Sequence, residues 1–426
     1  MPKRKYDGLL GKFSFIHGNI LVVTITVGFW SFGMRMTQSY SSLYILALGA
    51  SPFILGVINA VSVFILAFMR IPGGYIADRW GRKKVIYSLT FLAALTYFIY
   101  AFAIDWTWIL IGSILASLSF MYQPALQAIV ADSLPSEKRG IGYSIVRFLP
   151  IIIGIPASVI ALLLVKDLGL VSGMRIAYMV AGTMGIMAAL FRRFFLKETL
   201  TRHEAFKAED FSAISREIFS KLFEAMRKVR KEFLRLLIVY CMFNFAASFI
   251  LASRGGGGIT GAGLWMVFAR DVLNVNEVNW GWIVAFARVI SAFSIIPLGI
   301  IVDKFGRKKS LSLFLLLTFI SAILFIYPLN PYMIFIAYAI YVTAQFGFMN
   351  AYQSMRADLV PTEMRGRIIS GSELVANVVS VPASILGGYL YNYIGPRAPF
   401  IVFILITLMS IIFTVLGLKE PIIKEK

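Results

Sequence analysis

IPGGYIADRWGRKK, residues 71–84, returns 225 positions later as IPLGIIVDKFGRKK, residues 296–309. A second segment behaves alike, since ADSLPSEKRG at 131–140 returns as ADLVPTEMRG at 357–366, shifted by 226. The tripeptide PAS at 156–158 recurs at that same shift. Chance does not hold one register over so long a stretch, so the chain is a duplication of one structural unit.

Apolar runs fill the chain between these motifs. Of its 426 residues, 59% are hydrophobic and 15% are charged, whereas soluble domains have about half and about a quarter. Runs of about twenty apolar residues can each cross a hydrocarbon core of about 30 Å. We therefore predict an all-α membrane protein with twelve helices, at 18–47, 52–77, 84–104, 107–132, 140–165, 174–195, 233–270, 278–302, 309–328, 331–357, 367–393 and 397–418.

The duplication sets the expected domains. Residues 1–195 form one six-helix bundle, and residues 233–426 form the other, with a short tail. The charged segment 196–232 has apolar residues at three- and four-residue steps, which places them on one helix face. These residues are Phe211, Ile214, Ile218, Leu222, Met226, Val229 and Phe233. We predict an amphipathic linker helix on the cytoplasmic membrane surface, with a calmodulin-like partner site as the alternative.

The basic residues indicate the topology. The net charge is +20, and the lysines and arginines stand in short clusters between apolar runs. One set of loops holds most of them, and the other set holds little more than Lys166, Arg175, Arg270 and Arg397. The positive-inside rule then places both termini in the cytoplasm of a cell whose plasma membrane the chain spans. It explains the positive charge without a nucleic acid partner.

The sequence lacks the residues that several other classes of protein require. Cys241 is the one cysteine, and His17 and His203 do not stand near cysteines or carboxylates at metal-ligand spacing. No Gly-x-x-x-x-Gly-Lys-Ser/Thr string occurs, so an ATP-driven pump is not indicated. We therefore expect no cofactor, no metal site and no enzyme activity. A channel would need a repeated pore loop or a ring-forming oligomer, and we expect a monomer.

Two six-helix copies, each with a basic loop after its second span, resemble the major facilitator superfamily. The most specific element of the resemblance is Gly-x-x-x-Asp-Arg/Lys-x-Gly-Arg-Lys, which occurs at 74–83 and again at 299–308. The resemblance covers the whole chain. It implies two duplicated six-helix bundles around a central cavity, and a secondary transporter that moves a small solute by alternating access. A non-transporting receptor on the same fold is a further alternative.

The repeated loop also has a physical interpretation of its own. Gly81 and Gly306 allow a tight turn between antiparallel helices. Asp78 and Asp303 are acids among bases at a membrane boundary, where each can pair with an arginine or lie at a helix N-terminus. The alternative, that the charges only set topology, explains the bases but not a twice-placed aspartate and glycine.

In the resembled family this acid is thought to latch the two bundles on the cytoplasmic side when the outer gate is open. Carried over, Asp78 would face the start of the eleventh helix near Ser370, and Asp303 the start of the fifth near Gly140. Arg139, Arg365, Glu198 and Glu420 are expected to belong to the same ion-pair networks. The candidate gating residues are Gly74, Asp78, Arg79, Gly81, Arg82, Lys83, Asp132, Arg139, Glu198, Gly299, Asp303, Lys304, Gly306, Arg307, Lys308, Asp358, Arg365 and Glu420.

Polar residues inside the spans are candidate cavity residues, because a mid-membrane charge costs about 2.5–3.5 kcal/mol on insertion scales. Thr24, Ser31, Arg35, Gln38 and Ser42 follow one face of the first helix and should line water. The alternative is helix packing. The candidates for the substrate cavity are Ser31, Arg35, Gln38, Asn244, Arg254, Arg288, Tyr338, Tyr341 and Gln345.

Two further features concern gating and energy coupling. Arg254 precedes the glycine run 255–258, which cannot hold a stable helix interior, so the seventh helix should be broken, as a gate hinge would be. Arg147 and Glu373 occupy matching repeat positions and could pair with each other. Glu373 is the one acid that we place inside a span, which makes it the candidate proton-accepting group; a structural ion pair is the alternative.

The function predicted first is a drug-exporter-like proton antiporter, because the chain resembles such exporters in size and loop pattern. Its support is incomplete, because the fourth helix has no arginine from Trp108 to Ala131, and the fifth-helix motif survives only loosely as Gly154-Ile-Pro156. The runner-up is a facilitator or symporter for a small organic anion. The arginine-rich interior favours it, because guanidinium groups bind carboxylate or phosphate bidentately.

Overall fold

The computed structural model describes residues 17–134, 139–200, 220, 224, 230–251, 262–360 and 365–420, without the side chains of 70, 71, 74, 75, 139–145, 147–151 and 365–367. Within these ranges the secondary structure is helical, and no strand occurs. The expected all-α fold is confirmed. The predicted linker helix lies almost wholly outside the described residues, so the domain boundaries remain a prediction.

The first half of the described chain, 17–200, holds the first six membrane-length segments. Its helices are α2 (Asn19–Gln38), α3 (Ser41–Ala47), α4 (Pro52–Trp80), α5 (Arg82–Ala101), α6 (Trp106–Ser119), η1 (Phe120–Tyr122), α7 (Gln123–Ser133), α8 (Arg139–Leu168) and α9 (Leu170–Phe195). Local chemistry sets the helix starts. Ser51 accepts a hydrogen bond from the Ile54 N–H to cap α4, and Asp105 accepts one from the Thr107 N–H to cap α6.

The second half, 230–420, repeats this order. Its helices are α11 (Lys231–Phe249), α12 (Leu264–Asp271), α13 (Glu277–Phe305), α14 (Arg307–Ile326), α15 (Pro331–Leu359), α16 (Arg365–Tyr389), the π-helical turn η3 (Leu390–Ile394) and α17 (Ala398–Gly417). Eleven segments of the described chain are long and apolar enough to cross a membrane. The 30-residue α8, part of whose side chains lie outside the description, completes the predicted twelve.

Three of the predicted spans are interrupted. The seventh breaks as expected, because α11 ends at Phe249 and α12 begins at Leu264. Arg254 and the glycine run 255–258 lie outside the described residues. The first span was expected to be continuous and is not: α2 ends at Gln38, and Tyr40 leaves helical geometry before α3. The fourth contains the 3-10 turn η1, which leads into Pro124 near the start of α7.

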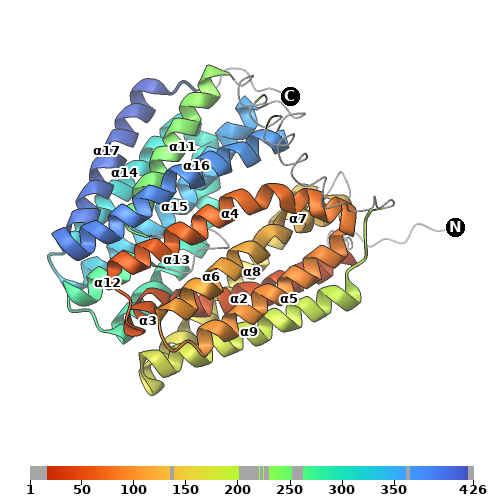
Figure 1. Cartoon of the computed structure of the whole chain (residues 1–426). Helices are drawn as coiled ribbons and strands as arrows, with labels where there is room; N and C mark the ends of the chain where they lie inside the picture. Colours follow the sequence, from red (N-terminus) through yellow and green to blue (C-terminus); the bar gives the residue numbers. More distant parts are fainter. Residues whose placement is uncertain are drawn as a thin grey trace, which may run out of the picture.

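The two halves form two groups of helices that lie side by side (Figure 1). In the first, α2 packs on α8 and α9, and α5 packs on α9; in the second, α15 packs on α13 and α14, and α17 packs on α11 and α14. The main contacts between the halves are made by α4 with α16 and η3, by α8 with α13 and by α3 with α12. These pairs define the surface along which the halves meet.

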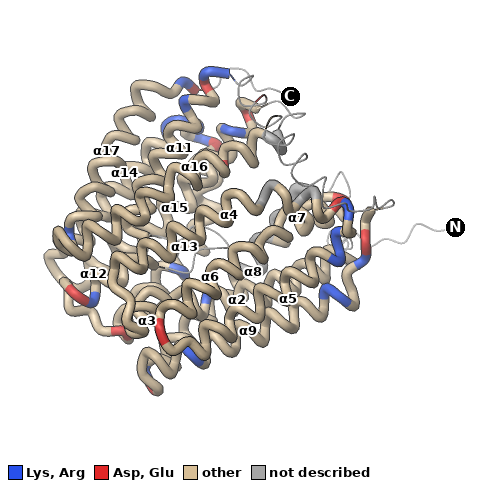
Figure 2. Tube along the Cα trace, viewed as in Figure 1, with Lys and Arg blue, Asp and Glu red and all other residues tan. Residues whose placement is uncertain are grey.

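The molecule has two unlike ends. Lysines and arginines gather at one end, where Arg82, Lys83, Arg307 and Lys308 start α5 and α14 (Figure 2). We call this the basic end. The opposite end, which holds α3, α12 and the start of α4, carries charges of both signs and is called the closed end.

The halves touch at the closed end and part toward the basic end. At the closed end Tyr40 Oη donates to the Glu277 carbonyl oxygen at 3.0 Å, and Trp280 Nε1 donates to the Ser39 carbonyl oxygen at 3.2 Å. Along α4 and α16, the contact reaches the small buried cluster of Ala67 and Leu374. Beyond it α4 continues to Trp80, and the ribbons of the two halves diverge (Figure 1).

Candidate functional site

Arg35 of α2 and Arg288 of α13 meet where the two halves join. Arg288 Nη1 donates to the carbonyl oxygen of Arg35 at 3.1 Å and also to the hydroxyl of Ser158 on α8. Ser158 is almost fully buried. A side chain of the second half is therefore held by a main-chain and a side-chain oxygen of the first half.

A glycine makes room for the first of these arginines. A Cβ on Gly154 of α8 would lie 2.8 Å from Arg35 Cγ, closer than real Cβ contacts come. The aliphatic stem of Arg35 therefore runs over α8 where that helix has no side chain. Gly154 and Ser158 stand one turn apart on α8, so one face of this helix holds both arginines.

The charges of the two arginines are not balanced by acids. Within the described part of the chain, neither guanidinium has a carboxylate at salt-bridge distance. The two like charges lie close enough to repel each other. Both arginines are half-buried, and a charge that is removed from water is unfavourable unless it is paired, so this pair of cations is a candidate binding position for an anion.

Aromatic side chains of the second half pack beside the arginines. Tyr338 lies near Arg288 and packs on Trp280, with ring centroids 5.0 Å apart. Tyr341, one turn further along α15, packs on Trp265 at 4.5 Å. Gln345 follows on the same face, and its Nε2 is buried without a hydrogen-bond partner among the described residues. The predicted polar face of α15 is thus a buried face, directed at the second half's own aromatic cluster.

The other residues predicted on the polar face of the first helix differ in how exposed they are. Ser31 and Gln38 are half-buried on α2. Thr24 and Ser42, at the ends of the predicted stripe, are buried, and Thr24 donates to the Ile20 carbonyl oxygen of its own helix at 2.7 Å. Neither side chain faces water as expected. For Ser42 the reason is that α2 ends at Gln38 and the helical register does not continue to Ser42.

Asn244 and Ser248 on α11 are also satisfied locally. Asn244 Nδ2 donates to the Tyr240 carbonyl oxygen at 2.7 Å, and Ser248 Oγ donates to the Asn244 carbonyl oxygen at 2.9 Å. Asn244 is buried. These contacts support the packing alternative for this face of α11.

Glu373 has an arginine partner that the sequence did not suggest. Arg356 Nη1 lies 3.8 Å from Glu373 Oε1, and the Arg356 guanidinium lies over the Tyr352 ring at 5.1 Å. Tyr352 in turn stacks on Tyr240 at 4.1 Å. Arg356 lies near the end of a predicted span, where an arginine is typical of the membrane boundary and does not indicate a partner. The side chain of Arg147, the expected partner, lies outside the described residues.

The Arg356–Glu373 pair has a distinct position along the molecule. Glu373 directly precedes Leu374, which belongs to the last buried cluster between the halves on the way to the basic end. Its side chain is 27% exposed, and that of Arg356 is 11% exposed. The pair therefore lies at the level where the halves separate.

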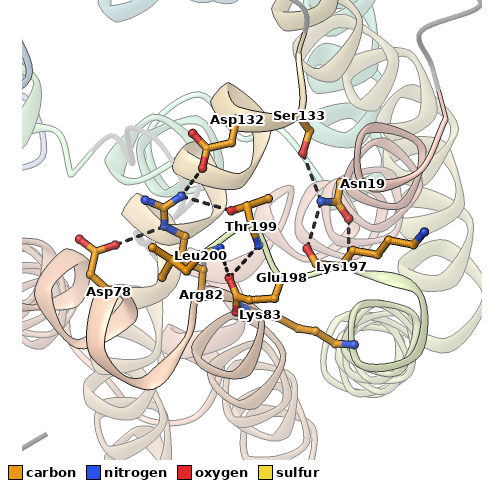
Figure 3. Close-up of polar contacts among 10 residues, drawn as sticks. All are labelled: Asn19, Asp78, Arg82, Lys83, Asp132, Ser133, Lys197, Glu198, Thr199 and Leu200. Carbon is orange, nitrogen blue, oxygen red and sulfur yellow. Dashed lines mark hydrogen bonds and ion pairs between the residues drawn. The ribbon is translucent and has the colours of Figure 1, made fainter. Parts of the chain in front are cut away.

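The basic loop of the first half forms one network at the basic end (Figure 3). The Arg82 guanidinium contacts Asp78 at 3.2 Å, the Asp132 carboxylate, and Thr199 Oγ1 at 3.2 Å. Glu198 accepts a hydrogen bond from the Lys83 N–H at 2.9 Å. The loop after α4 is thereby tied to the ends of α7 and α9.

The second half repeats two features of this arrangement, the arginine–aspartate pair and the glutamate at the helix start. Arg307 Nε lies 3.0 Å from Asp358 Oδ2. Glu420 accepts hydrogen bonds from the Arg307 N–H at 2.6 Å and from the Lys308 N–H at 2.8 Å. Glu198 and Glu420 were expected in ion-pair networks; they are instead N-terminal caps of α5 and α14, where the helix dipole favours a negative charge.

The two loop glycines have the backbone geometry that the motif requires. Gly81 and Gly306 have φ of +91° and +86°, a region that other residues rarely adopt. A Cβ on Gly306 would also lie 2.9 Å from Glu420 Oε1. The spacing that both copies of the repeat share therefore allows both a tight turn and a helix cap.

The geometry agrees with the comparison to known families. The family model described as Major Facilitator Superfamily matches residues 23–255 and 250–426. The chain belongs to the major facilitator superfamily. It is therefore a transporter-family membrane protein, and the family and fold point away from an enzyme.

Two relatives of this superfamily member are each 22% identical to it. It is 22% identical over 387 residues to an uncharacterised MFS-type transporter, MJ1317, of Methanocaldococcus jannaschii, covering 88% of this chain and 89% of that one. It is 22% identical over 372 residues to the magnetosome protein MamH of Paramagnetospirillum magneticum, covering 81% and 78%.

Solved structures share the fold. A POT family transporter in complex with a thioalcohol-conjugated peptide superposes with a TM-score of 0.72 at 15% identity, over 95% of this chain and 96% of that one. A bacterial homologue of the human lysosomal transporter Spinster, inward-facing and unoccupied, gives 0.67 at 17% identity, over 96% of both chains. The human organic anion transporter MFSD10 gives 0.63 at 16%, over 93% and 98%.

Among the residues that the structure describes, no contact joins either loop aspartate to the other half, as the expected latch would require. Asp78 pairs with Arg82 within its own half, and its side chain is 59% exposed. Asp303 and Lys304 are exposed, and both aspartates stand at the end where the halves part. Gly74 and Gly299 lie inside α4 and α13, and Arg79 is half-buried. The side chains of Arg139 and Arg365 lie outside the described residues, and latching remains a prediction.

One buried arginine, Arg192, was not among the site residues predicted from the sequence. Arg192 of α9 is 1% exposed, and it donates to Thr26 Oγ1 at 3.1 Å and to Thr90 Oγ1 at 2.5 Å. Its guanidinium also lies over the Tyr122 ring at 5.3 Å. It joins α2, α5 and η1 inside the first half. The sequence did not indicate a buried role for Arg192, because the pair Arg192 and Arg193 is typical of the basic end of a membrane helix.

Proposed function

We propose that this superfamily member is a secondary transporter that moves a small organic anion by alternating access. The observation that supports the proposal is the Arg35–Arg288 pair, which the two halves contribute jointly and which has no ion-paired acid among the described residues. Guanidinium groups bind carboxylate, phosphate and sulfonate groups through two parallel hydrogen bonds. An anion held there would contact both halves at once.

The charge distribution supports an orientation. Under the positive-inside rule, the basic end faces the cytoplasm, together with both termini. The halves then meet on the outer side and part on the cytoplasmic side, so the described conformation is the inward-facing one. A plasma membrane location follows from the same assignment and is part of the proposal.

The structural neighbours are compatible with an anion. MFSD10 is described as an organic anion transporter, and one POT family neighbour, at a TM-score of 0.69 and 14% identity, is a peptide transporter in complex with sulfate. At these identities the likeness concerns the fold, so the substrate class rests on the arginine pair of this chain.

The drug-exporter-like proton antiporter becomes the second candidate. It depends on Glu373, which lies 3.8 Å from Arg356 and whose side chain is partly exposed. Nothing comparable to an acidic cation-binding position stands beside Arg35 and Arg288 within the described residues. The anion is therefore preferred over a cationic drug, and protons remain a proposed coupling ion for a monomeric carrier.

A binding screen tests the substrate class. The purified protein would be heated with phosphate, sulfate, succinate or benzoate, or with the cations ethidium or tetraphenylphosphonium, at one ionic strength. A ligand at a hundred times its Kd stabilises the folded state by about 2.7 kcal/mol. We expect at least one anion to raise the Tm of the wild type.

Matched variants assign that effect to the site. Arg35→Gln and Arg288→Gln should both lose the anion-induced rise in Tm. Arg397→Gln is the control, because Arg397 lies over the Tyr327 ring at the closed end, away from the pair. A rise in Tm with a cation and with no anion would reject the proposal in favour of the exporter.

A further inference from the structure

One face of α13 contacts the first half near the closed end and loses that contact further along. A Cβ on Gly281 would overlap with Tyr40 Oη, and Arg288, two turns on, donates to the Ser158 hydroxyl. Gly299 lies on the same face, since the eleven residues from Arg288 make about three helical turns. A Cβ there would meet no described atom of a neighbouring helix within 4 Å. The described surfaces of the two halves therefore separate between Arg288 and Gly299.

The face of α13 beyond this point is apolar. Residues 289–302 include no charged residue. Ala292 and Ile295 follow Arg288 on its own face of the helix, and both are half-buried. Ile296, at the edge of that face, is 68% exposed. An apolar surface thus extends from the arginine toward the basic end.

The helix α8 continues this apolar surface in the first half. Residues 148–157, which precede Ser158, are apolar, glycine or proline throughout. Ile155 lies one turn from Ser158 toward the basic end and is half-buried, and Ile152, about one turn further, is 44% exposed. The two helices that meet at the arginine pair therefore both become apolar where they separate.

The arginine pair consequently lies at the inner end of an apolar passage between α8 and α13. A small hydrated anion such as phosphate would gain only the guanidinium contacts there. An anion with a hydrocarbon tail would gain the same contacts and would also remove apolar surface from water. Each methylene that is fully buried strengthens binding about fourfold, which corresponds to about 0.8 kcal/mol.

We propose, on the basis of the anion transport proposed above, that the natural substrate is an amphiphilic anion. Its acidic head group lies between Arg35 and Arg288, where the charges are complementary. Its hydrocarbon tail extends along α8 and α13 toward the basic end, against Ile155 and Ile295 and into the space at Gly299. The α13 segment from Arg288 to Gly299 is about 16 Å long at about 1.5 Å per residue, so the tail is an unbranched chain of medium length.

A chain-length series tests the tail. The Kd values of butyrate, hexanoate, octanoate and decanoate would be measured by calorimetry with the protein in lipid nanodiscs, below the concentration at which each forms micelles. Empty nanodiscs give the blank for partition into lipid. The alkylamines of the same chain lengths are the control for the head group. We expect the Kd of the carboxylates to fall about two- to fourfold per methylene, and the amines to show no saturable binding.

Two variants assign the effect to the passage. Ile295→Ser places a hydroxyl against the tail, so the gain per methylene should shrink while the Kd of butyrate stays unchanged. Gly299→Leu fills the space at the end of the passage, so the gain should stop at a shorter chain. Leu316→Ser is the matched control, because Leu316 is 43% exposed on α14, which packs on α15 and α17 away from the boundary between the halves. Its chain-length dependence should equal that of the wild type.

The outcomes separate this inference from the proposed function. If phosphate or succinate raises the Tm but the carboxylates bind equally at every chain length, the anion class stands and the tail is wrong. A fall in Kd that Ile295→Ser and Gly299→Leu leave unchanged would also overturn the tail position. If the alkylamines bind as the carboxylates do, or if no anion binds, the proposed anion transport is rejected together with this inference.

Discussion

Asn59 of α4 and Ser384 of α16 form a buried hydrogen bond of 3.0 Å across the boundary between the two halves. The helices approach closely there because glycines face each other. A Cβ on Gly56 would lie 2.5 Å from the Ser384 carbonyl oxygen, and one on Gly388 would lie 2.5 Å from the Pro52 carbonyl oxygen. Main chain packs on main chain, so the closed end can shut without a layer of side chains between the halves.

The first prediction concerns this contact. Gly56→Val should prevent closure at the closed end, because the added side chain meets main-chain atoms that cannot move aside. The distance between spin labels placed at the exposed residues Ile104 and Leu329, one in each half at the closed end, should lengthen. Transport should fall, while the protein still inserts. Gly417→Val is the control, since a Cβ there meets only the Phe413 side chain at an ordinary 3.4 Å. A wild-type distance in Gly56→Val would show that the glycine is not needed for closure.

The second prediction concerns the proposed latch. Asp78→Asn or Asp303→Asn should slow transport while leaving expression and insertion intact. Arg82 keeps its contacts with Asp132 and Thr199 when Asp78 is neutral, so the first half should stay folded. Transport of the anion found by the binding screen would be compared with thermal stability in each variant. Wild-type rates in both variants would exclude a latching role.

The third prediction concerns the helix caps. Glu420→Ala removes the acceptor of two N–H groups at the start of α14, and loss of such a cap costs about 0.5–2 kcal/mol. The Tm of the second half should fall accordingly. Lys419→Ala, next to it and exposed, should leave the Tm unchanged. A Tm equal to that of the wild type in Glu420→Ala would mean that water replaces the cap.

The fourth prediction separates two roles of Glu373. If it carries a driving proton, Glu373→Gln should abolish pH-driven accumulation and leave downhill exchange intact. If it only balances Arg356, the variant should lose stability, because it leaves a half-buried charge unpaired. Both transport modes and the Tm would be measured. Undiminished accumulation would rule Glu373 out as the coupling group.

A double variant sharpens that comparison. Removing both charges, as Glu373→Gln with Arg356→Gln, should restore the stability lost in the single variant if the pair is structural. It should not restore accumulation if the carboxyl group carries the proton. A double variant that is no more stable than Glu373→Gln would indicate that the two side chains act independently.

The sequence by itself determined the membrane architecture. Span lengths, loop charges and the repeat are properties of continuous segments, so the twelve helices and the two basic loops could be located before any contact was known. A break in the seventh helix could also be predicted from the glycine run 255–258, although that run lies outside the described residues. Arg35 and Arg288 could be selected as candidate site residues because a charge inside a membrane is unfavourable wherever it stands.

Only the tertiary structure decided which residues meet. Arg288 reaches Ser158 across the halves, Glu373 lies beside Arg356, and Glu420 caps α14 instead of joining an ion pair. A helical pattern tells which face of a helix is polar, but not which neighbour covers that face. In a membrane protein the lipid and the protein interior are both apolar, so the sequence does not show which apolar helix face is buried in the protein. Which side chains contact one another is therefore decided only by how the helices pack.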